Sequence, residues 1–265
     1  MLSGTHASHA VATTEVVMNS VVGGFQWGLD RMLAIGYGVL YDYIFEQFAP
    51  YQALRTEVID VLESTVPAGT TRRDVHVLDV ACGPGNMTVT LGEAGFAATG
   101  VDPYAALVDV AREKRRAQNL TNVAFRHGDL ARGNTFKAES FDRLVNVHSL
   151  YLHGSPARLL EEAHRVLKPG GYAVFVNRTR PVSDWATLRE LKAREGLAAA
   201  LRSLLWVAPN SIFEKARKRS GGPHYWNEDA FGTALRDTGF TVLSMRRTFL
   251  HRSSLLAVVR KDTRE

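Results

Sequence analysis

The sequence of 265 residues contains a single cysteine, Cys82, and this scarcity excludes several kinds of protein. One cysteine cannot form a disulfide within the chain, so a small secreted fold held together by disulfides is excluded. A zinc site built from several cysteine thiolates is excluded for the same reason. Because disulfides are rare in the reducing cytoplasm, we expect a cytoplasmic protein.

The chain also lacks the patterns of a secretory signal and of a membrane-spanning helix. Its first residues, MLSGTHASHAVATTEV, show no basic stretch followed by an apolar one, as a signal peptide requires. The apolar run MLAIGYGVLYDYIF is shorter than the roughly 20 residues that a spanning helix needs, and Asp42 interrupts it. We expect this run to form a buried or interfacial helix.

A strong excess of one charge is also missing, since the net charge is only +5. We therefore expect a small-molecule substrate and no nucleic-acid partner. The basic residues concentrate in residues 178–220, which hold ten Arg and Lys against four Asp and Glu. A solvated helix face explains such a run most simply, but an anionic substrate or an anionic membrane surface also fits. Peripheral membrane contact and a homodimer therefore stay open.

Segments typical of strands and helices alternate from about residue 76 to residue 177. The expected strands are HVLDVA, AATGVD, NVAFRHGD, FDRLVNVHSL and YAVFVN, with helices such as MTVTLGEAG, YAALVDVAREKRRAQN and PARLLEEAHRVL between them. This alternation predicts an α/β fold, an open doubly wound sheet of mostly parallel strands with right-handed crossovers. The last two segments, FTVLSMRRTFL and SSLLAVVRK, predict an antiparallel hairpin at the sheet edge, with its turn at residues 251–253.

Four regions follow from this pattern. We expect residues 1–14 to be disordered and residues 15–70 to form a helical, aromatic-rich segment, which acts either as a lid over an apolar pocket or as packing for the main domain. Residues 71–180 and 239–265 form the core, and residues 181–238 form a helical cap inserted between the fifth and sixth strands.

The stretch VLDVACGPGNMT, residues 77–88, predicts a strand that runs into a glycine-rich turn before a helix. The pattern Gly-x-x-x-x-Gly-Lys-Ser/Thr is absent, which excludes a P-loop. A dinucleotide site calls for a third glycine five residues after Gly83, and Thr88 stands there instead. The remaining candidate is S-adenosylmethionine (SAM), which carries a ribose, an adenine and an ammonium group but no pyrophosphate.

Polar residues that could bind these parts end the predicted strands. Asp102 could accept hydrogen bonds from both ribose hydroxyls, and Tyr104 could pack on the adenine face. Asp129 could accept a hydrogen bond from the adenine amino group. Asp79 lies inside an apolar strand, where a lone carboxylate is costly, so we expect it to order the turn and to face the ammonium group.

Five pieces of the chain now show a family resemblance: VLDVACGPG, GVDPY, HGDL, FDRLVNVHSL and EEAHRVLKPGGYAVFVN. In order and spacing the chain resembles class I SAM-dependent methyltransferases over roughly residues 50–177, and is most similar in pattern to ubiquinone/menaquinone-type small-molecule methyltransferases. The resemblance implies a seven-stranded sheet of order 3-2-1-4-5-7-6 with the last strand antiparallel. It implies SAM as cofactor, converted to S-adenosylhomocysteine (SAH), and no metal. The implied cofactor-binding residues are Asp79, Ala81, Gly83, Gly85, Asp102, Pro103, Tyr104, Asp129, Leu130 and Asn146.

The residues that follow the fourth strand should face the reactive methyl group. We expect His148, His153 and Tyr151 to carry the catalytic roles, with the histidines as candidate bases. In many relatives a His-His pair follows this strand, but here the two positions are Tyr151 and Leu152, so no base is transferred by resemblance. The expected substrate-binding residues are Tyr37, Tyr41, Ser149, Tyr225 and Trp226.

Several substrate classes are disfavoured by missing motifs. The sequence Asn-Pro-Pro-Tyr, which marks exocyclic-amine methylation, does not follow the fourth strand. Carbon methylation of pyrimidines needs a nucleophilic cysteine, and Cys82 lies in the cofactor loop. We therefore expect a methyltransferase that acts on a small, hydrophobic organic acceptor, with a slight preference for oxygen. The alternatives are a quinone or lipid C-methyltransferase at a membrane surface, an inactive SAM- or SAH-binding partner subunit and, disfavoured by Thr88, an NAD-dependent oxidoreductase.

Overall fold

A computed structural model describes residues 45–263, apart from residues 134, 182 and 205–223. Seven strands form one sheet in the order β3-β2-β1-β4-β5-β7-β6. Strands β1 to β5 run parallel, whereas β7 is antiparallel to both β5 and β6. The predicted strand order and the antiparallel edge hairpin are confirmed. The strands are β1 His76–Val80, β2 Ala97–Asp102, β3 Val123–His127, β4 Phe141–Val147, β5 Leu167–Arg178, β6 Phe240–Thr248 and β7 Ser254–Lys261.

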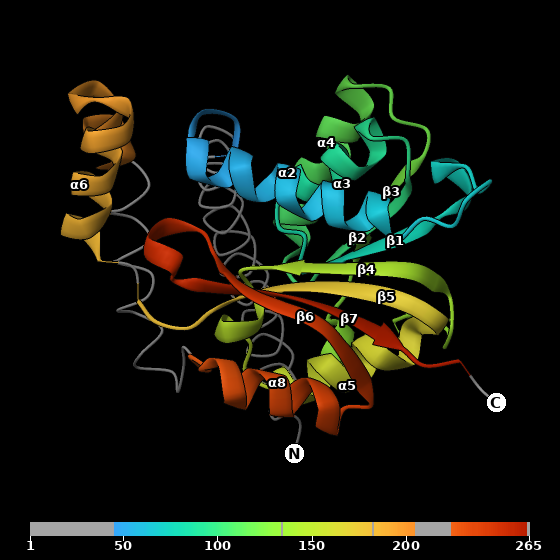
Figure 1. The fold of residues 1–265 in the computed structure, drawn as a ribbon. Coiled ribbons are helices and arrows are strands. Elements are labelled where there is room, and N and C mark those ends of the chain that lie inside the picture. Colours follow the sequence, from blue (N-terminus) through green and yellow to red (C-terminus); the bar gives the residue numbers. More distant parts are fainter. Residues whose placement is uncertain (1–44, 134, 182, 205–223, 264–265) are drawn as a thin grey trace, which may run out of the picture.

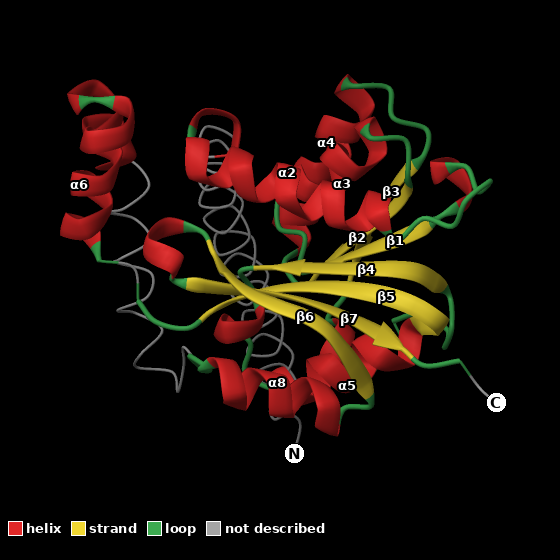
Figure 2. Ribbon diagram, viewed as in Figure 1, coloured by secondary structure: helices red, strands yellow, loops and turns green. Residues whose placement is uncertain are grey.

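Helices cover both faces of the sheet (Figures 1 and 2). One face carries α2 Ala49–Ser64, α3 Asn86–Glu93 and α4 Ala105–Ala117, and the opposite face carries α5 Pro156–Val166 and α8 Glu228–Asp237. Each face has its own cluster of buried apolar side chains. Neighbouring residues of β1 serve both clusters, since Val77 belongs to one and Leu78 to the other. Burial on both faces explains why the central strands read as continuous apolar runs.

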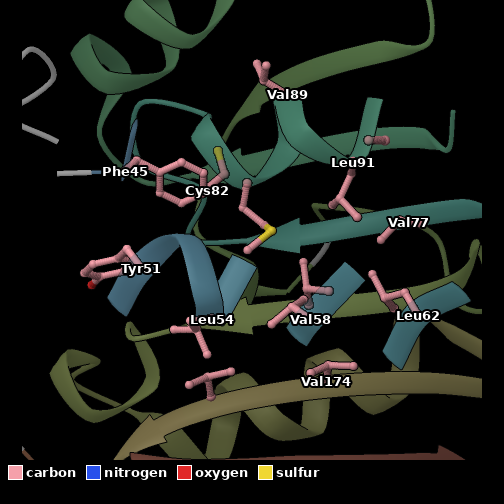
Figure 3. Close-up of a cluster of buried hydrophobic side chains, with 14 of the residues drawn as sticks. Phe45, Tyr51, Leu54, Val58, Leu62, Val77, Cys82, Val89, Leu91 and Val174 are labelled. Carbon is pink, nitrogen blue, oxygen red and sulfur yellow. The ribbon is translucent and has the colours of Figure 1, made fainter. Parts of the chain in front are cut away.

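The helix α2 forms part of the core and starts at a proline. Phe48 has extended backbone angles, and Pro50 stands in the first turn of α2, so α2 is separated from the helical residues 45–47. The buried positions recur at helical spacing and fill the space between α2 and strands β1 and β5, as Figure 3 shows. These positions are Tyr51, Leu54, Val58 and Leu62. The end of the expected lid therefore packs on the sheet, and residues 15–44 lie outside the described residues.

The helical insertion is seen in part. It contains α6 Asp184–Glu195, a helical stretch over residues 197–204, and α8. The helix α6 lies beyond the end of the sheet where β4 and β5 terminate (Figure 1). Within the described ranges, no helix combines the length and the apolar character that crossing a membrane requires.

The connection between β6 and β7 is a 3₁₀ turn, Leu250–Arg252. Phe249, which precedes the turn, and His251 and Arg252 within it have positive φ, which is unfavourable for residues with a Cβ atom. Glu190 of α6 holds the turn through the backbone N–H of His251 at 3.3 Å and the His251 Nδ1 at 2.8 Å. The turn thus ties the insertion to the sheet edge.

Candidate functional site

The turn after β1 changes direction through three residues with positive φ. Ala81 has φ of 56°, Gly83 of 54° and Gly85 of 85°. Hydrogen bonds hold this shape, because Cys82 donates its N–H to the carbonyl of Val101 at 3.1 Å and Gly85 donates to the carbonyl of Cys82 at 3.0 Å. The helix α3 then begins with Gly85 as its N-cap, so its free N–H groups point toward the end of the sheet.

The surroundings of the two glycines in this turn differ. A Cβ on Gly85 would lie 2.7 Å from the Cβ of Ala111 and from the ring of Phe125, so side-chain packing requires glycine there. A Cβ on Gly83 would meet nothing within 4 Å. Gly83 therefore faces open space, and its backbone is the part of the turn that a ligand can approach closely.

Asp102 links the end of β2 to this turn. Its Oδ2 accepts a hydrogen bond from the N–H of Gly83 at 2.8 Å, and its Oδ1 accepts one from the N–H of Tyr104 at 2.9 Å. Burial raises the pKa of Asp102, and the two backbone hydrogen bonds oppose that rise. The Tyr104 side chain is 56% exposed at the start of α4, beside the carboxylate of Asp102.

Asp79 is a buried carboxylate, with 2% of its surface exposed. The Thr88 hydroxyl donates to its Oδ2 at 2.6 Å. Burial raises the pKa of Asp79 to about 7, and the negative charge of Asp102 adds to that rise. No ion pair joins Asp79 to a Lys or Arg among the residues that the structure describes. An ammonium group of a ligand would compensate this carboxylate, so the residues present fit the amino acid part of SAM.

Asp129 ends β3 with its carboxylate engaged by the protein. Its Oδ1 accepts from the N–H of Ala131 at 3.0 Å and lies 3.4 Å from the Nε2 of His153. The Nδ1 of His153 accepts from the N–H of Ser155 at 3.0 Å, so the ring proton is on Nε2 and points at Asp129. The role of Asp129 toward adenine stays a prediction. Of two further predicted cofactor residues, Leu130 is buried in the core, whereas Pro103 is exposed and its carbonyl lies 3.0 Å from the Nε2 of His127.

The side-chain amide of Asn146 in β4 forms hydrogen bonds through its nitrogen but not through its oxygen. Its Nδ2 donates to the carbonyl of Val80 at 3.0 Å and to the hydroxyl of Ser149 at 2.5 Å. Its Oδ1 is enclosed and accepts no hydrogen bond. The structure thus brings the predicted cofactor residue Asn146 and the predicted substrate residue Ser149 together.

His148 lies in the interior, where its two ring nitrogens are both engaged. Its Nδ1 is 3.1 Å from the hydroxyl of Tyr51, and its Nε2 is 2.8 Å from the hydroxyl of Ser254. Burial lowers the pKa of His148 well below its ordinary value, and the positive charge of Arg178 lowers it further. The ring is therefore neutral at physiological pH, and its contacts are those of a residue that positions β4 against α2 and β7.

Tyr151 and Tyr225 stack on each other, with ring centroids 5.7 Å apart. The N–H of His224 donates to the carbonyl of Tyr151 at 2.6 Å, and the Arg178 guanidinium lies 5.3 Å from the centre of the Tyr151 ring. Trp226 stacks instead on Phe231 of α8. The predicted Tyr37 and Tyr41 lie outside the described residues.

Five buried polar residues at this edge were not predicted: Tyr51, Asn177, Arg178, Ser253 and Ser254. Asn177 and Arg178 had a signal in the sequence, because they end the apolar run YAVFV much as Asp79 interrupts VLDV. Tyr51 and Ser254 had none, since their importance comes from contacts with His148. In the described part of the chain, no group of three or more His, Cys, Asp or Glu side chains is arranged to hold a metal ion.

Comparison with known proteins agrees with this geometry. Residues 78–175 match a family model described as a methyltransferase domain. The chain contains a class I SAM-dependent methyltransferase domain. This methyltransferase domain spans the glycine turn, Asp102, Asp129 and the residues that follow β4.

The names of two curated relatives of the methyltransferase domain refer to different molecules. The chain is 33% identical over 142 residues to phthiotriol/phenolphthiotriol dimycocerosates methyltransferase 1 of Mycobacterium ulcerans, covering 49% of this chain and 50% of that protein. It is 34% identical over 110 residues to the ubiquinone biosynthesis O-methyltransferase of Coxiella burnetii, covering 41% of this chain and 46% of that protein. The chain thus spans about half the length of the curated relatives it matches.

The fold also matches solved structures. A SAM-dependent methyltransferase from Aquifex aeolicus superposes with a TM-score of 0.54 at 17% identity, covering 83% of this chain and 93% of that chain. This likeness shows that the seven-stranded sheet has the Rossmann-like methyltransferase fold.

Proposed function

We propose that the protein transfers the methyl group of SAM to a small, hydrophobic and uncharged organic acceptor, with oxygen as the favoured atom. The observation that carries this proposal is the pair of buried carboxylates, Asp79 and Asp102, at the end of the sheet beside Gly83. A buried carboxylate near neutral pKa without a cationic partner fits a zwitterionic ligand better than a dinucleotide.

The residues of the chain would divide the work as follows. Asp102 and the backbone of Gly83 would hold the ribose, Tyr104 would cover the adenine, and Asp79 would face the ammonium group. When bound, SAM supplies an electrophilic methyl group on its sulfonium. The protein then has to hold the acceptor in line with that group and to exclude water.

The acceptor side is lined by rings and by neutral polar groups. Tyr151 and Tyr225 form a stacked pair beside the residues that follow β4, which suits a flat or apolar acceptor. Both histidines have their two ring nitrogens engaged, His148 by Tyr51 and Ser254, and His153 by the N–H of Ser155 and the carboxylate of Asp129. His153 would take the proton of a hydroxyl acceptor only after its Nδ1 gives up the bond from Ser155, so holding the acceptor in line is the main task of the protein. The preference for oxygen is supported by the name of the relative from Coxiella burnetii. A cytoplasmic setting is supported by the free, buried thiol of Cys82.

Transfer of label from methyl-labelled SAM tests this function. The purified protein is incubated with the labelled SAM and an extract of the source cells, and the products are separated into organic-soluble, aqueous, protein and RNA fractions. We expect label in the organic-soluble fraction. Label confined to protein or RNA would contradict the substrate class. No label in any fraction, with SAH still bound, would favour an inactive SAM-binding partner subunit.

A second candidate is a quinone or lipid methyltransferase that works at a membrane surface. Apolar side chains of the insertion are exposed, with Trp185 at 78%, Leu197 at 59% and Leu201 at 56%. Exposed Arg189, Lys192 and Arg202 lie in the same segments. Exposed apolar and basic residues together favour binding to an anionic interface.

Sedimentation with vesicles distinguishes the two candidates. The second candidate predicts that the protein sediments with vesicles of anionic phospholipid, and that W185Q together with L201Q weakens this binding. The matched control is L243Q, which removes an apolar side chain, 46% exposed, from β6. No sedimentation of the unmodified protein would contradict the membrane candidate and leave the first one in place.

A further inference from the structure

Three polar side chains at the end of β4, β5 and β7 have buried atoms without hydrogen bonds. They are the Oδ1 of Asn146, both the Oδ1 and the Nδ2 of Asn177, and the Oγ of Ser253. Each of these residues is 1% exposed. A buried polar group without a partner costs about 1–3 kcal/mol, so several of them at one end of a sheet are an arrangement that folding alone does not favour.

The side chains of Asn146 and Asn177 lie on one face of the sheet. Asn146 is the register partner of Phe175, and Asn177 follows Phe175 by two residues, so all three share a face. Phe175 belongs to the apolar cluster on the α5 and α8 side, and Asn177 is paired with Leu255 of that cluster. Ser253 lies just before β7, in a helical conformation at the end of the 3₁₀ turn.

One aromatic residue of the segment before α8 lies on this face, since Trp226 packs against the same cluster. The Tyr151–Tyr225 pair instead lies near the guanidinium of Arg178, which alternates with Asn177 along β5. The polar atoms are thus at the end of the sheet where the glycine turn lies, on the side of Trp226. Because these atoms are enclosed, a ligand reaches them only when the side chains around them move.

We propose that Asn146 and Asn177 form the polar subsite of the methyl acceptor, and that this subsite selects an uncharged acceptor with a free hydroxyl group. This inference rests on the proposed function, and it names the acceptor's chemical class. It assigns Asn177 as the residue that decides specificity, because both atoms of its amide are unused.

The chemistry of the subsite selects a hydroxyl over charged groups. Two of the unused atoms are carbonyl oxygens, Asn146 Oδ1 and Asn177 Oδ1, which repel a carboxylate and need a hydrogen-bond donor. The Asn177 Nδ2 is a donor and needs an acceptor. A hydroxyl provides a donor and an acceptor on one atom. The buried Arg178, next to Asn177 in β5, disfavours an ammonium group by its charge.

The variant Asn177→Leu tests the subsite without knowledge of the natural acceptor. Leucine has a similar shape and removes the two unpartnered atoms, so we expect an unchanged or higher melting temperature. The matched control is Asn122→Leu. The Nδ2 of Asn122 donates to the carbonyls of Gly92 and Phe96, both at 2.8 Å, so this variant should lower the melting temperature.

The ligand probes are tert-butylcatechol, an apolar uncharged diol, and tert-butylbenzoate, an apolar anion. With SAH present, we expect tert-butylcatechol to raise the melting temperature of the unmodified protein and tert-butylbenzoate to have no effect. In Asn177→Leu the Kd for tert-butylcatechol should rise about three- to tenfold, the loss of one or two hydrogen bonds, while the Kd for SAH changes by less than about twofold.

Three results would overturn the subsite. One is a melting temperature of Asn177→Leu as low as that of Asn122→Leu, which would make Asn177 a structural amide. Another is equal binding of tert-butylcatechol by Asn177→Leu and by the unmodified protein, and the third is no binding of tert-butylcatechol at all. Failure of the unmodified protein to bind SAH would instead contradict the proposed function, and the two melting temperatures would still decide the role of Asn177.

Discussion

The hydroxyl of Thr88 donates a hydrogen bond of 2.6 Å to the buried carboxylate of Asp79. Thr88 stands where a dinucleotide-binding turn would have its third glycine, and Asp79 stands inside the first strand. A glycine at residue 88 would leave this carboxylate without its hydroxyl partner. Thr88 thus disfavours a dinucleotide site and also binds the Asp79 carboxylate, which would face the ammonium group of SAM.

The affinity for SAH should depend on pH through Asp79. Its pKa is raised from 3.8 to about 7 in the free protein, so below pH 7 the group holds a proton that binding of an ammonium must displace. We expect the affinity to rise between about pH 6 and about pH 7, by at most tenfold per pH unit, and then to level off. Isothermal titration with SAH in buffers of different pH measures this. The variant Asp79→Asn should bind SAH weakly and without this dependence, and an unchanged pH profile in that variant would refute the assignment.

The stability of the free protein should respond to the same group. Because the pKa of Asp79 is higher in the folded state than its ordinary 3.8, its contribution to stability is complete below about pH 4 and is lost as the pH rises through about 7. We therefore expect the free energy of unfolding of the unmodified protein, measured with urea, to fall relative to that of Asp79→Asn as the pH rises from about 4 to about 7. Parallel pH profiles for the two proteins would contradict the raised pKa.

Removing the Asp102 carboxylate should weaken cofactor binding. Asp102→Ala deletes the expected ribose acceptor and the two bonds to the backbone of Gly83 and Tyr104, so we expect a loss of about 1.5–3 kcal/mol in SAH binding. The control is Asp109→Ala, an acid on α4 whose partner is the exposed Arg112. Equal SAH affinity in the folded Asp102→Ala protein and in Asp109→Ala would show that the ribose lies elsewhere.

Replacing Ala81 with glycine should stabilise the folded protein. Its φ of 56° is unfavourable for a residue with a Cβ, so Ala81→Gly should stabilise the protein by about 1 kcal/mol, despite the greater backbone entropy of glycine when unfolded. Ala106→Gly, in the helix α4, should have the opposite effect, a loss of about 0.5–1 kcal/mol. Chemical denaturation measures the change in the free energy of unfolding of each variant. A lower free energy of unfolding for Ala81→Gly would mean that the turn is not strained.

The contacts of His148 should matter for stability. Tyr51→Phe and Ser254→Ala each leave one buried ring nitrogen without a partner, so we expect each variant to lose about 1–3 kcal/mol of stability. Tyr172→Phe serves as the control, because the Tyr172 ring faces Arg143 and no hydrogen bond of its hydroxyl is seen within the described residues. Losses no larger than that of Tyr172→Phe would show that His148 is free to serve as a base.

The sheet and half of the site were predictable because their signals are local. Alternating apolar runs predict the parallel strands, and a carboxylate within an apolar run, as at Asp79, predicts a functional group. The partners of His148 could not be predicted in this way. Tyr51 and Ser254 lie 97 and 106 residues from it in the sequence. The packing of α2 on the sheet brings Tyr51 to His148, and the order of strands β4, β5 and β7 brings Ser254 there. The break at Phe48 has no signal in the apolar pattern, which continues across Pro50.

The most direct test of the account is a crystal structure of the protein with SAH. We predict that the ribose hydroxyls bind Asp102, that the backbone of Gly83 lies against the ligand, and that the amino group faces Asp79. An SAH molecule bound away from both carboxylates, or an empty site in crystals grown with saturating SAH, would contradict the central claim that this edge of the sheet holds SAM.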